Sequence, residues 1–197
     1  MRHVWDSKEW QATRLGDIKF NILARANSAP KLGDLSVREL CCLAKNPWCP
    51  VGIYAFIKDD SIIYTGKTHG RSFHERMVSH LDHRDPIAGS PHLAQLVQSM
   101  IRKGDSKTAE EAVSKVLDMN IIWLPVPKFN LSDSVHKILI ALIERRLLWE
   151  KCLNPRFNSP RVKKNDTFML RGYRYNLSVD QLAGDVNQLN HLLTSAK

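Results

Sequence analysis

One stretch constrains the fold of this chain more than any other. Residues 51–66 read VGIYAFIKDDSIIYTG. Two runs of β-branched and aromatic residues, Val51–Ile57 and Ile62–Thr65, flank a short polar turn, which is the pattern of a β-hairpin. Gly52 and Gly66 each lie two residues from a tyrosine, and a glycine inside a strand often marks a close approach by a ligand or another backbone. The stretch therefore predicts a core hairpin with such an approach beside its tyrosines.

Helices are expected to surround this hairpin. The spacing of apolar residues and the Pro and Gly breaks predict helices over about 35–44, 71–84, 92–103, 108–117, 132–153 and 178–193, a loop at 67–70, and an edge or terminal strand at 120–126. Thr108 and Glu111 have the spacing of a capping box. In the helix from 71, Phe73, Met77 and Leu81 form a core stripe, with Arg76 and His80 on a neighbouring face.

The charge of the chain favours an anionic partner. Lys and Arg total 29 against 20 for Asp and Glu, a formal net charge of +9. Such an excess suits a polyanion, because each neutralised phosphate releases condensed counterions. No apolar run is long enough for a membrane helix, and the four cysteines show no disulfide framework. We expect a cytoplasmic protein with reduced thiols, no membrane partner, and a nucleic acid as its partner.

The longest predicted helix carries one unusual residue. Glu144 lies between Ile140 and Leu148 on an otherwise apolar surface. A carboxylate among apolar neighbours is unfavourable unless it is paired, exposed at a cleft or bound to a metal. Glu144 is therefore a candidate site residue.

These features, in this order, resemble the GIY-YIG nuclease family. Gly52-Ile53-Tyr54 matches the first motif, and Tyr64-Thr65-Gly66 matches the second with threonine in place of isoleucine. Arg76 and His80 have the four-residue spacing of that family, Glu144 follows on the long helix, and residues 154–158 (NPRFN) are similar to its closing segment. The resemblance covers roughly residues 50–160.

The resemblance implies an α/β (α+β) fold: a small, mainly antiparallel sheet flanked by helices. The apolar spacing outside it predicts helical N- and C-terminal extensions. The expected organisation is a helical extension over 1–50, the nuclease domain over 51–160, and a basic, aromatic segment with a C-terminal helix over 161–197 that packs on the same domain. Its implied activity is Mg²⁺-dependent hydrolysis of DNA to 5′-phosphate and 3′-hydroxyl ends, with Mn²⁺ as a substitute ion.

The resemblance also implies a role for each site residue. Tyr54 would be the general base, Tyr64 and His80 would orient the attacking water, and Arg76 would contact the scissile phosphate. Glu144 would hold the metal ion. The remaining implied members are Asn158, which would hold the site together by hydrogen bonds, Lys67, which would add positive charge, and the supporting glycines Gly52 and Gly66.

Two of these assignments have a rival residue, and a further set of basic residues is expected to contact DNA. Arg71 rivals Arg76 as the catalytic arginine, and Glu150 rivals Glu144 as the carboxylate. Basic side chains that mix with aromatics suit a surface that tracks a phosphate backbone. The expected DNA contacts are Arg71, Arg84, Arg156, Arg161, Lys163, Lys164, Arg171 and Arg174.

The compact plan favours a type II restriction or phage-defence enzyme, because no separate DNA-binding module is recognisable. Symmetric double-strand cleavage by a chain with one site implies a homodimer or homotetramer. The alternatives are a structure-selective repair or recombination nuclease and a catalytically inactive nucleic-acid-binding protein of the same fold.

Overall fold

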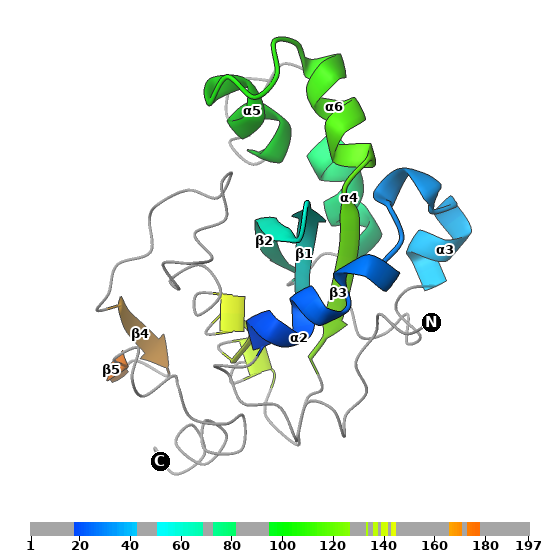
Figure 1. Ribbon diagram of the computed structural model, residues 1–197. Helices are drawn as coiled ribbons and strands as arrows, with labels where there is room; N and C mark the ends of the chain where they lie inside the picture. Colours follow the sequence, from blue (N-terminus) through cyan, green and yellow to red (C-terminus); the bar gives the residue numbers. More distant parts are fainter. Residues whose placement is uncertain are drawn as a thin grey trace.

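The computed structural model describes residues 18–42, 51–68, 73–81, 95–126, 133, 136, 137, 139–141, 143, 144, 166–170 and 173–177. The first elements are the helix α2 (Ile18–Ala24), the 3-10 turns η2 (Ala26–Ser28) and η3 (Leu32–Asp34), and the helix α3 (Val37–Cys42) (Figure 1). Of the helices in the described ranges, none has the length and apolar character needed to cross a membrane.

The predicted hairpin is confirmed. Strands β1 (Gly52–Lys58) and β2 (Ser61–Thr68) pair antiparallel through a turn at Asp59 and Asp60. Both turn residues have positive φ, 48° and 56°, which is the geometry of the two-residue turns that match the twist of paired strands. The loop expected at 67–70 was wrong in its first half: Lys67 and Thr68 belong to β2, because pairing with β1 continues to its first residue, Gly52.

A third strand completes the small sheet. β3 (Asn120–Pro125) pairs antiparallel with β1, so the strand order is β2-β1-β3 and the predicted edge position of this strand is confirmed. Side chains directly opposite one another in paired strands share a face. Tyr54 therefore shares one face with Gly66 and Trp123, whereas Lys67 belongs to the opposite face.

Three helices pack on the face that carries Tyr54. They are α4 (Phe73–Leu81), α5 (Gln95–Arg102) and α6 (Ala109–Leu117). Phe73 and Met77 are buried against the strand aromatics, which confirms the predicted core stripe of α4. The Phe73 ring stacks on Trp123 with centroids 5.3 Å apart. The expected mixture of helices with a small antiparallel sheet is thus present.

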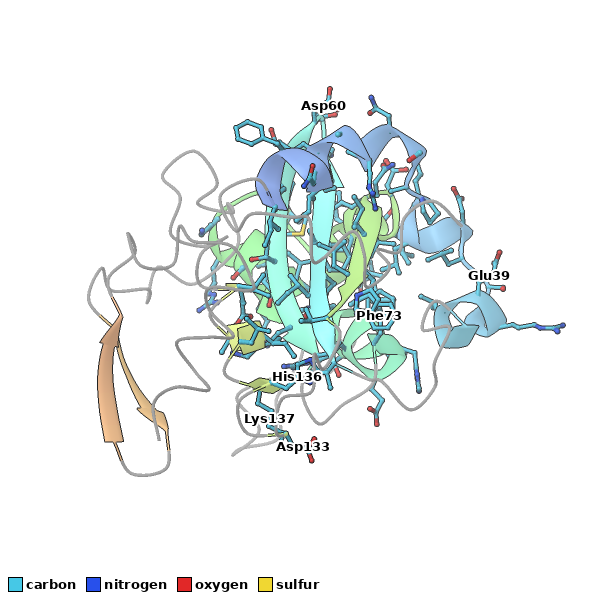
Figure 2. The ribbon with its side chains drawn as sticks, turned by 90° about the horizontal axis from the view of Figure 1, so that it is seen from below. Glu39, Asp60, Phe73, Asp133, His136 and Lys137 are labelled. Carbon is cyan, nitrogen blue, oxygen red and sulfur yellow. The ribbon has the colours of Figure 1, made fainter. Side chains whose placement is uncertain are left out.

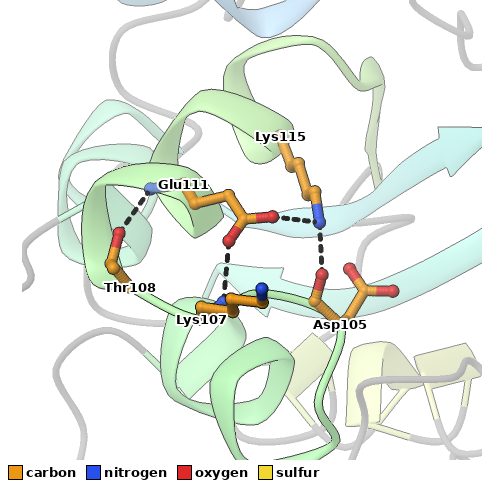
Figure 3. A network of polar contacts seen from close by, with 5 residues as sticks. All are labelled: Asp105, Lys107, Thr108, Glu111 and Lys115. Atoms are coloured by element: carbon orange, nitrogen blue, oxygen red, sulfur yellow. Dashed lines mark hydrogen bonds and ion pairs between the residues drawn. The ribbon is translucent and has the colours of Figure 1, made fainter.

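The capping of α6 follows the sequence with one change. The Thr108 hydroxyl accepts the Glu111 N–H at 3.2 Å, as the capping box predicts. The Glu111 carboxylate instead accepts the N–H of Lys107 at 2.7 Å and pairs with Lys115 at 2.9 Å (Figure 3). The network ties the turn before α6 to its third helical turn.

A second capping pair sets the start of α3. The Ser36 N–H donates to the Glu39 carboxylate at 2.9 Å, and the Glu39 N–H donates to the Ser36 hydroxyl at 3.2 Å. This reciprocal pair starts the helix at Val37, two residues later than the predicted Leu35. Upstream, the N–H of Leu32 donates to the Met119 carbonyl at 2.9 Å, which ties this segment to the start of β3.

A further pair of strands was not predicted. β4 (Asp166–Leu170) and β5 (Tyr173–Leu177) form a separate antiparallel two-stranded sheet, within a segment for which the sequence analysis assigned no strand (Figure 1). Aromatic residues, which favour strands, alternate with basic residues in this segment, and the basic residues favoured a surface that binds DNA over a strand. The helix expected over 178–193 lies outside the described residues.

Candidate active site

One pocket of about 130 Å³ gathers most of the predicted site residues. They come from β1, β2, α4 and the helix that contains residue 144. The lining residues are Tyr54, Tyr64, Gly66, Lys67, Arg76, Ser79, His80 and Glu144. Residues up to 90 positions apart in sequence therefore meet in one small cavity.

Two buried tyrosines form the wall of the pocket. Tyr54 is 2% exposed and Tyr64 is 7% exposed, and their rings stack with centroids 6.3 Å apart. Burial raises the pKa of Tyr54 well above its usual value and raises the pKa of Tyr64 to about 12. The nearby Arg76 charge opposes both shifts, because a cation favours the phenolate.

Gly66 provides the space that the Tyr54 ring occupies. It faces Tyr54 directly across the β1–β2 pairing. A Cβ atom at this position would overlap the ring carbon and hydroxyl of Tyr54. The close approach predicted beside this glycine is therefore an approach by the tyrosine ring.

Gly52 has a different, structural role. It does not line the pocket, and a Cβ atom there would lie 2.5 Å from the Leu124 carbonyl oxygen and 3.0 Å from the Trp123 indole nitrogen. This glycine allows β1 and β3 to pair closely at the end of the sheet. It supports the site through the position of Tyr54, two residues along the same strand.

His80 contacts the Tyr54 hydroxyl. Its Nε2 lies 2.7 Å from the Tyr54 oxygen, and the imidazole is 5% exposed. Burial, and then the charge of Arg76, lower the pKa of His80 to about 3, so the ring is neutral near pH 7. Its Nδ1 is buried and lacks a hydrogen bond. A buried N–H group without a hydrogen bond is rarer than a buried acceptor without one, so Nδ1 is assigned as the unprotonated nitrogen. The proton is therefore on Nε2, which donates it to the Tyr54 hydroxyl oxygen.

Arg76 brings a cation to the same wall. It lies one helical turn before His80 on α4 and is half-buried. Its Nε is buried without a hydrogen bond, and among the described residues no carboxylate pairs with it. A guanidinium in this condition suits a planar, bidentate anion such as a phosphate.

Lys67 and Glu144 form an ion pair at the other side of the pocket. The Lys67 ammonium lies 2.8 Å from the Glu144 carboxylate, with side chains 32% and 16% exposed. Lys67 belongs to the sheet face opposite Tyr54, and β2 is an edge strand. The pocket therefore spans the β2 edge and joins groups from both faces of the sheet. The predicted need of Glu144 for a partner is met by Lys67.

Two residues that the sequence analysis missed help to build the site. The His136 Nε2 donates to the Val126 carbonyl at 2.8 Å, which ties the helix of Glu144 to the end of β3. Figure 2 shows His136 near one end of the hairpin strands and Asp60 at the other. His136 lies eight residues before Glu144 on the same helical face. A second polar residue on that apolar face is the feature of the sequence that could have identified it.

Ser79 is the other addition. It lines the pocket between Arg76 and His80, and its hydroxyl donates to the Glu75 carbonyl at 2.6 Å. That bond is made within the helix and leaves the hydroxyl oxygen able to accept another hydrogen bond. Serine is common on helix surfaces, so nothing in the sequence singled it out.

Nine of the predicted site residues lie outside the described ranges. They are Arg71, Arg84, Glu150, Arg156, Asn158, Arg161, Lys163, Lys164 and Arg171. Arg174 lies on β5, opposite Met169. Their roles remain predictions, as does the choice of Arg76 over Arg71 and of Glu144 over Glu150.

The donor set limits the kind of metal site. Within the described residues, no cluster of three or more His, Cys, Asp or Glu side chains is arranged to hold an ion. Of the described residues that line the pocket, Glu144 is the single carboxylate. A Mg²⁺ ion that keeps most of its water needs only one or two carboxylates together with substrate phosphate oxygens. The described part of the pocket, with one carboxylate, fits an ion of that kind.

Comparisons of this chain with protein-family models, with curated proteins and with solved structures find no match. The functional interpretation therefore depends on the geometry of the pocket and on the motifs in the sequence.

Proposed function

We propose that the chain is a metal-dependent phosphodiesterase. The observation that carries this proposal is the convergence of two tyrosines, a neutral histidine, an arginine that pairs with no carboxylate of the described residues, and a Lys–Glu pair in one pocket. Phosphodiester hydrolysis needs a base for the attacking water, cations for the phosphoryl oxygens, and stabilisation of the leaving oxygen. The pocket has a group suited to each of these tasks.

Within that class, we propose an endonuclease of the GIY-YIG type. The motifs Gly52-Ile53-Tyr54 and Tyr64-Thr65-Gly66 are on paired strands, and Arg76 and His80 follow on the next helix. The order of elements and the shared pocket support this assignment. DNA is the proposed substrate because of the net charge of +9, and a restriction or phage-defence enzyme is the proposed setting.

In the proposed reaction, Arg76 binds the scissile phosphate through its guanidinium. Tyr54 first loses its hydroxyl proton to bulk water, an equilibrium that burial disfavours and the Arg76 charge favours, and the resulting phenolate accepts a proton from the attacking water. The phenolate receives a hydrogen bond from the His80 Nε2, 2.7 Å away. Tyr64 stacks on Tyr54 and is positioned to orient the water. Glu144 would hold a hydrated Mg²⁺ or Mn²⁺ ion, whose chemistry is to stabilise negative charge on the leaving 3′ oxygen.

The test is cleavage of supercoiled plasmid and phage DNA with Mg²⁺. Wild type is compared with Glu144→Ala and with Glu110→Ala, which alters an exposed acidic residue of α6 outside the pocket. We expect discrete fragments from wild type and from Glu110→Ala, and none from Glu144→Ala. The fragment ends are then ligated without prior phosphorylation, which requires 5′-phosphates.

The other outcomes are decisive in different ways. Nicking or smearing that Glu144→Ala abolishes keeps the nuclease and removes the sequence-specific restriction enzyme, and branched DNA substrates would then be tried. DNA binding by both proteins without cleavage of any substrate would reject the enzyme in favour of a binding protein.

A further inference from the structure

The carboxylate of the ion pair in the pocket is more buried than the carboxylates of two other ion pairs in the described residues, Asp118 and Glu111. Lys67 and Glu144 are 32% and 16% exposed, whereas Lys31 and Asp118, also an ion pair, are 49% and 64% exposed. A carboxylate as buried as Glu144 is strongly disfavoured without a nearby cation. Without a bound ion, Lys67 is the cation that stabilises it.

A divalent ion at Glu144 would need the same carboxylate. Its second charge and its water shell would have to fit into a pocket of about 130 Å³ that also contains Arg76. Two cations that share one carboxylate in a partly buried site repel each other strongly. The ion and the Lys67 ammonium are therefore competing partners of Glu144.

The backbone of Lys67 stays beside the pocket when the side chain loses this partner. Its backbone is paired with Ile53 of the central strand, so only its side chain is free to move. The described lining of the pocket has no anionic side chain besides Glu144, so a displaced ammonium would meet the phosphate of a bound substrate there.

We propose that Lys67 is a resident counter-ion of Glu144, which the divalent cation displaces, and that the freed ammonium then binds the scissile phosphate. This inference rests on the proposed function and adds an order of events to it. Metal binding is weakened by Lys67 in the free protein, and phosphate binding compensates for that loss by giving the lysine a new partner.

The test measures Mn²⁺ binding without substrate, from the electron paramagnetic resonance signal of free Mn²⁺. The variants are Lys67→Met, which removes the charge, Lys67→Arg, which keeps it, and Glu144→Gln. Lys115→Met is the matched control, because Lys115 pairs with Glu111 at 2.9 Å and is 33% exposed, outside the pocket (Figure 3). Thermal unfolding establishes that each variant is folded.

We expect Lys67→Met to bind Mn²⁺ about tenfold more tightly than wild type, the size expected when a charged competitor of this kind is removed. Lys67→Arg and Lys115→Met should bind like wild type, and Glu144→Gln should lose the site. Lys67→Met should nevertheless cleave DNA more slowly, because the phosphate loses a cation. Tighter metal binding with slower cleavage is not expected from a merely structural lysine.

Failures of the two proposals can be told apart. If wild type cleaves DNA in a Glu144-dependent manner but Lys67→Met binds Mn²⁺ equally or more weakly, the counter-ion proposal is wrong and the nuclease stands. If Lys67→Met binds Mn²⁺ more tightly but no protein cleaves DNA, the competition is supported and the nuclease is rejected. Mn²⁺ binding that does not depend on Glu144 would overturn the counter-ion proposal.

Discussion

Tyr54 and Gly66 face each other across two paired strands, and the phenol ring of the tyrosine occupies the space that a side chain at Gly66 would need. Gly66 of the second motif thus leaves room for the ring of Tyr54 of the first motif. This relationship explains why the two motifs have to lie on neighbouring strands in this register. It also places the Tyr54 hydroxyl within 2.7 Å of His80.

Gly66→Ala should destabilise the fold through its clash with that ring. We expect a loss of about 1–3 kcal/mol in the free energy of unfolding, the usual range for overpacking a core. In a Tyr54→Ala background the same change should be nearly neutral, because the ring is absent. Urea unfolding of the four proteins in this cycle measures the coupling, and an equal loss in both backgrounds would contradict it.

Asp60→Gly should stabilise the hairpin. Asp60 has a φ of 56° at the second position of the turn, where glycine avoids the steric strain of a side chain. We expect a gain of about 1 kcal/mol in unfolding free energy. Asp60→Ala, which retains a Cβ atom and loses the local hydrogen bonding of aspartate, should be destabilising in the same assay. A loss of stability in the glycine variant would argue against this turn.

His80 should make the protein sensitive to acid. Its pKa is about 3 in the folded protein and about 6.5 when unfolded, so the unfolded state binds the proton first as the pH falls. Stability should decrease as the pH falls from about 6.5 toward about 3, by up to about 5 kcal/mol for a shift of this size.

The measurement for His80 is urea unfolding as a function of pH. His80→Gln should flatten the curve in this window, although its stability at pH 7 will be lower because the buried contact with Tyr54 changes. His74→Gln is the control, since His74 is an exposed residue of the same helix. Identical pH curves for wild type and His80→Gln would show that His80 is not the titrating group.

The cleavage rate should rise with pH across the neutral range. The pKa of Tyr54 is raised above its usual value of 10, so the phenolate fraction grows tenfold for each pH unit below that value. The logarithm of the single-turnover rate should increase with a slope near 1 from about pH 6 to about pH 9, and Tyr54→Phe should abolish cleavage.

A histidine base would behave differently from Tyr54. Because the pKa of His80 is lowered to about 3, a His80 base would already be deprotonated and would give a rate that stays flat between about pH 6 and about pH 9. A flat wild-type rate profile over this range would contradict the assignment of Tyr54, whose raised pKa predicts a rising rate.

Arg76→Lys should not restore the function of Arg76. A guanidinium binds two phosphate oxygens through a planar fork, whereas an ammonium is a point charge on a flexible chain. We expect the lysine variant to lose about as much kcat/KM on DNA as Arg76→Ala, at least 100-fold for a group that binds the transition state. Arg102→Lys, on α5 and outside the pocket, should retain wild-type activity. Near-normal activity of Arg76→Lys would favour Arg71 instead.

The amino-acid sequence determined the local elements of this protein. Alternating β-branched and aromatic residues around a polar turn specify β1 and β2, and the side chains at Thr108 and Glu111 specify the start of α6. The sequence predicts these elements because strand propensity, turn geometry and helix capping depend on interactions between residues close in sequence. The two Tyr–Gly pairs, Arg76 with His80, and the isolated carboxylate at Glu144 were likewise visible as candidates.

Tertiary structure alone decided which of these candidates meet. The pairing of Lys67 with Glu144 joins a strand to a helix far along the chain, and it depends on how that helix is anchored at His136. The neutral state of His80 depends on burial by several elements together. Burial and long-range pairing are properties of packing between distant segments, so the chemistry of the pocket arises from packing that no local pattern contains.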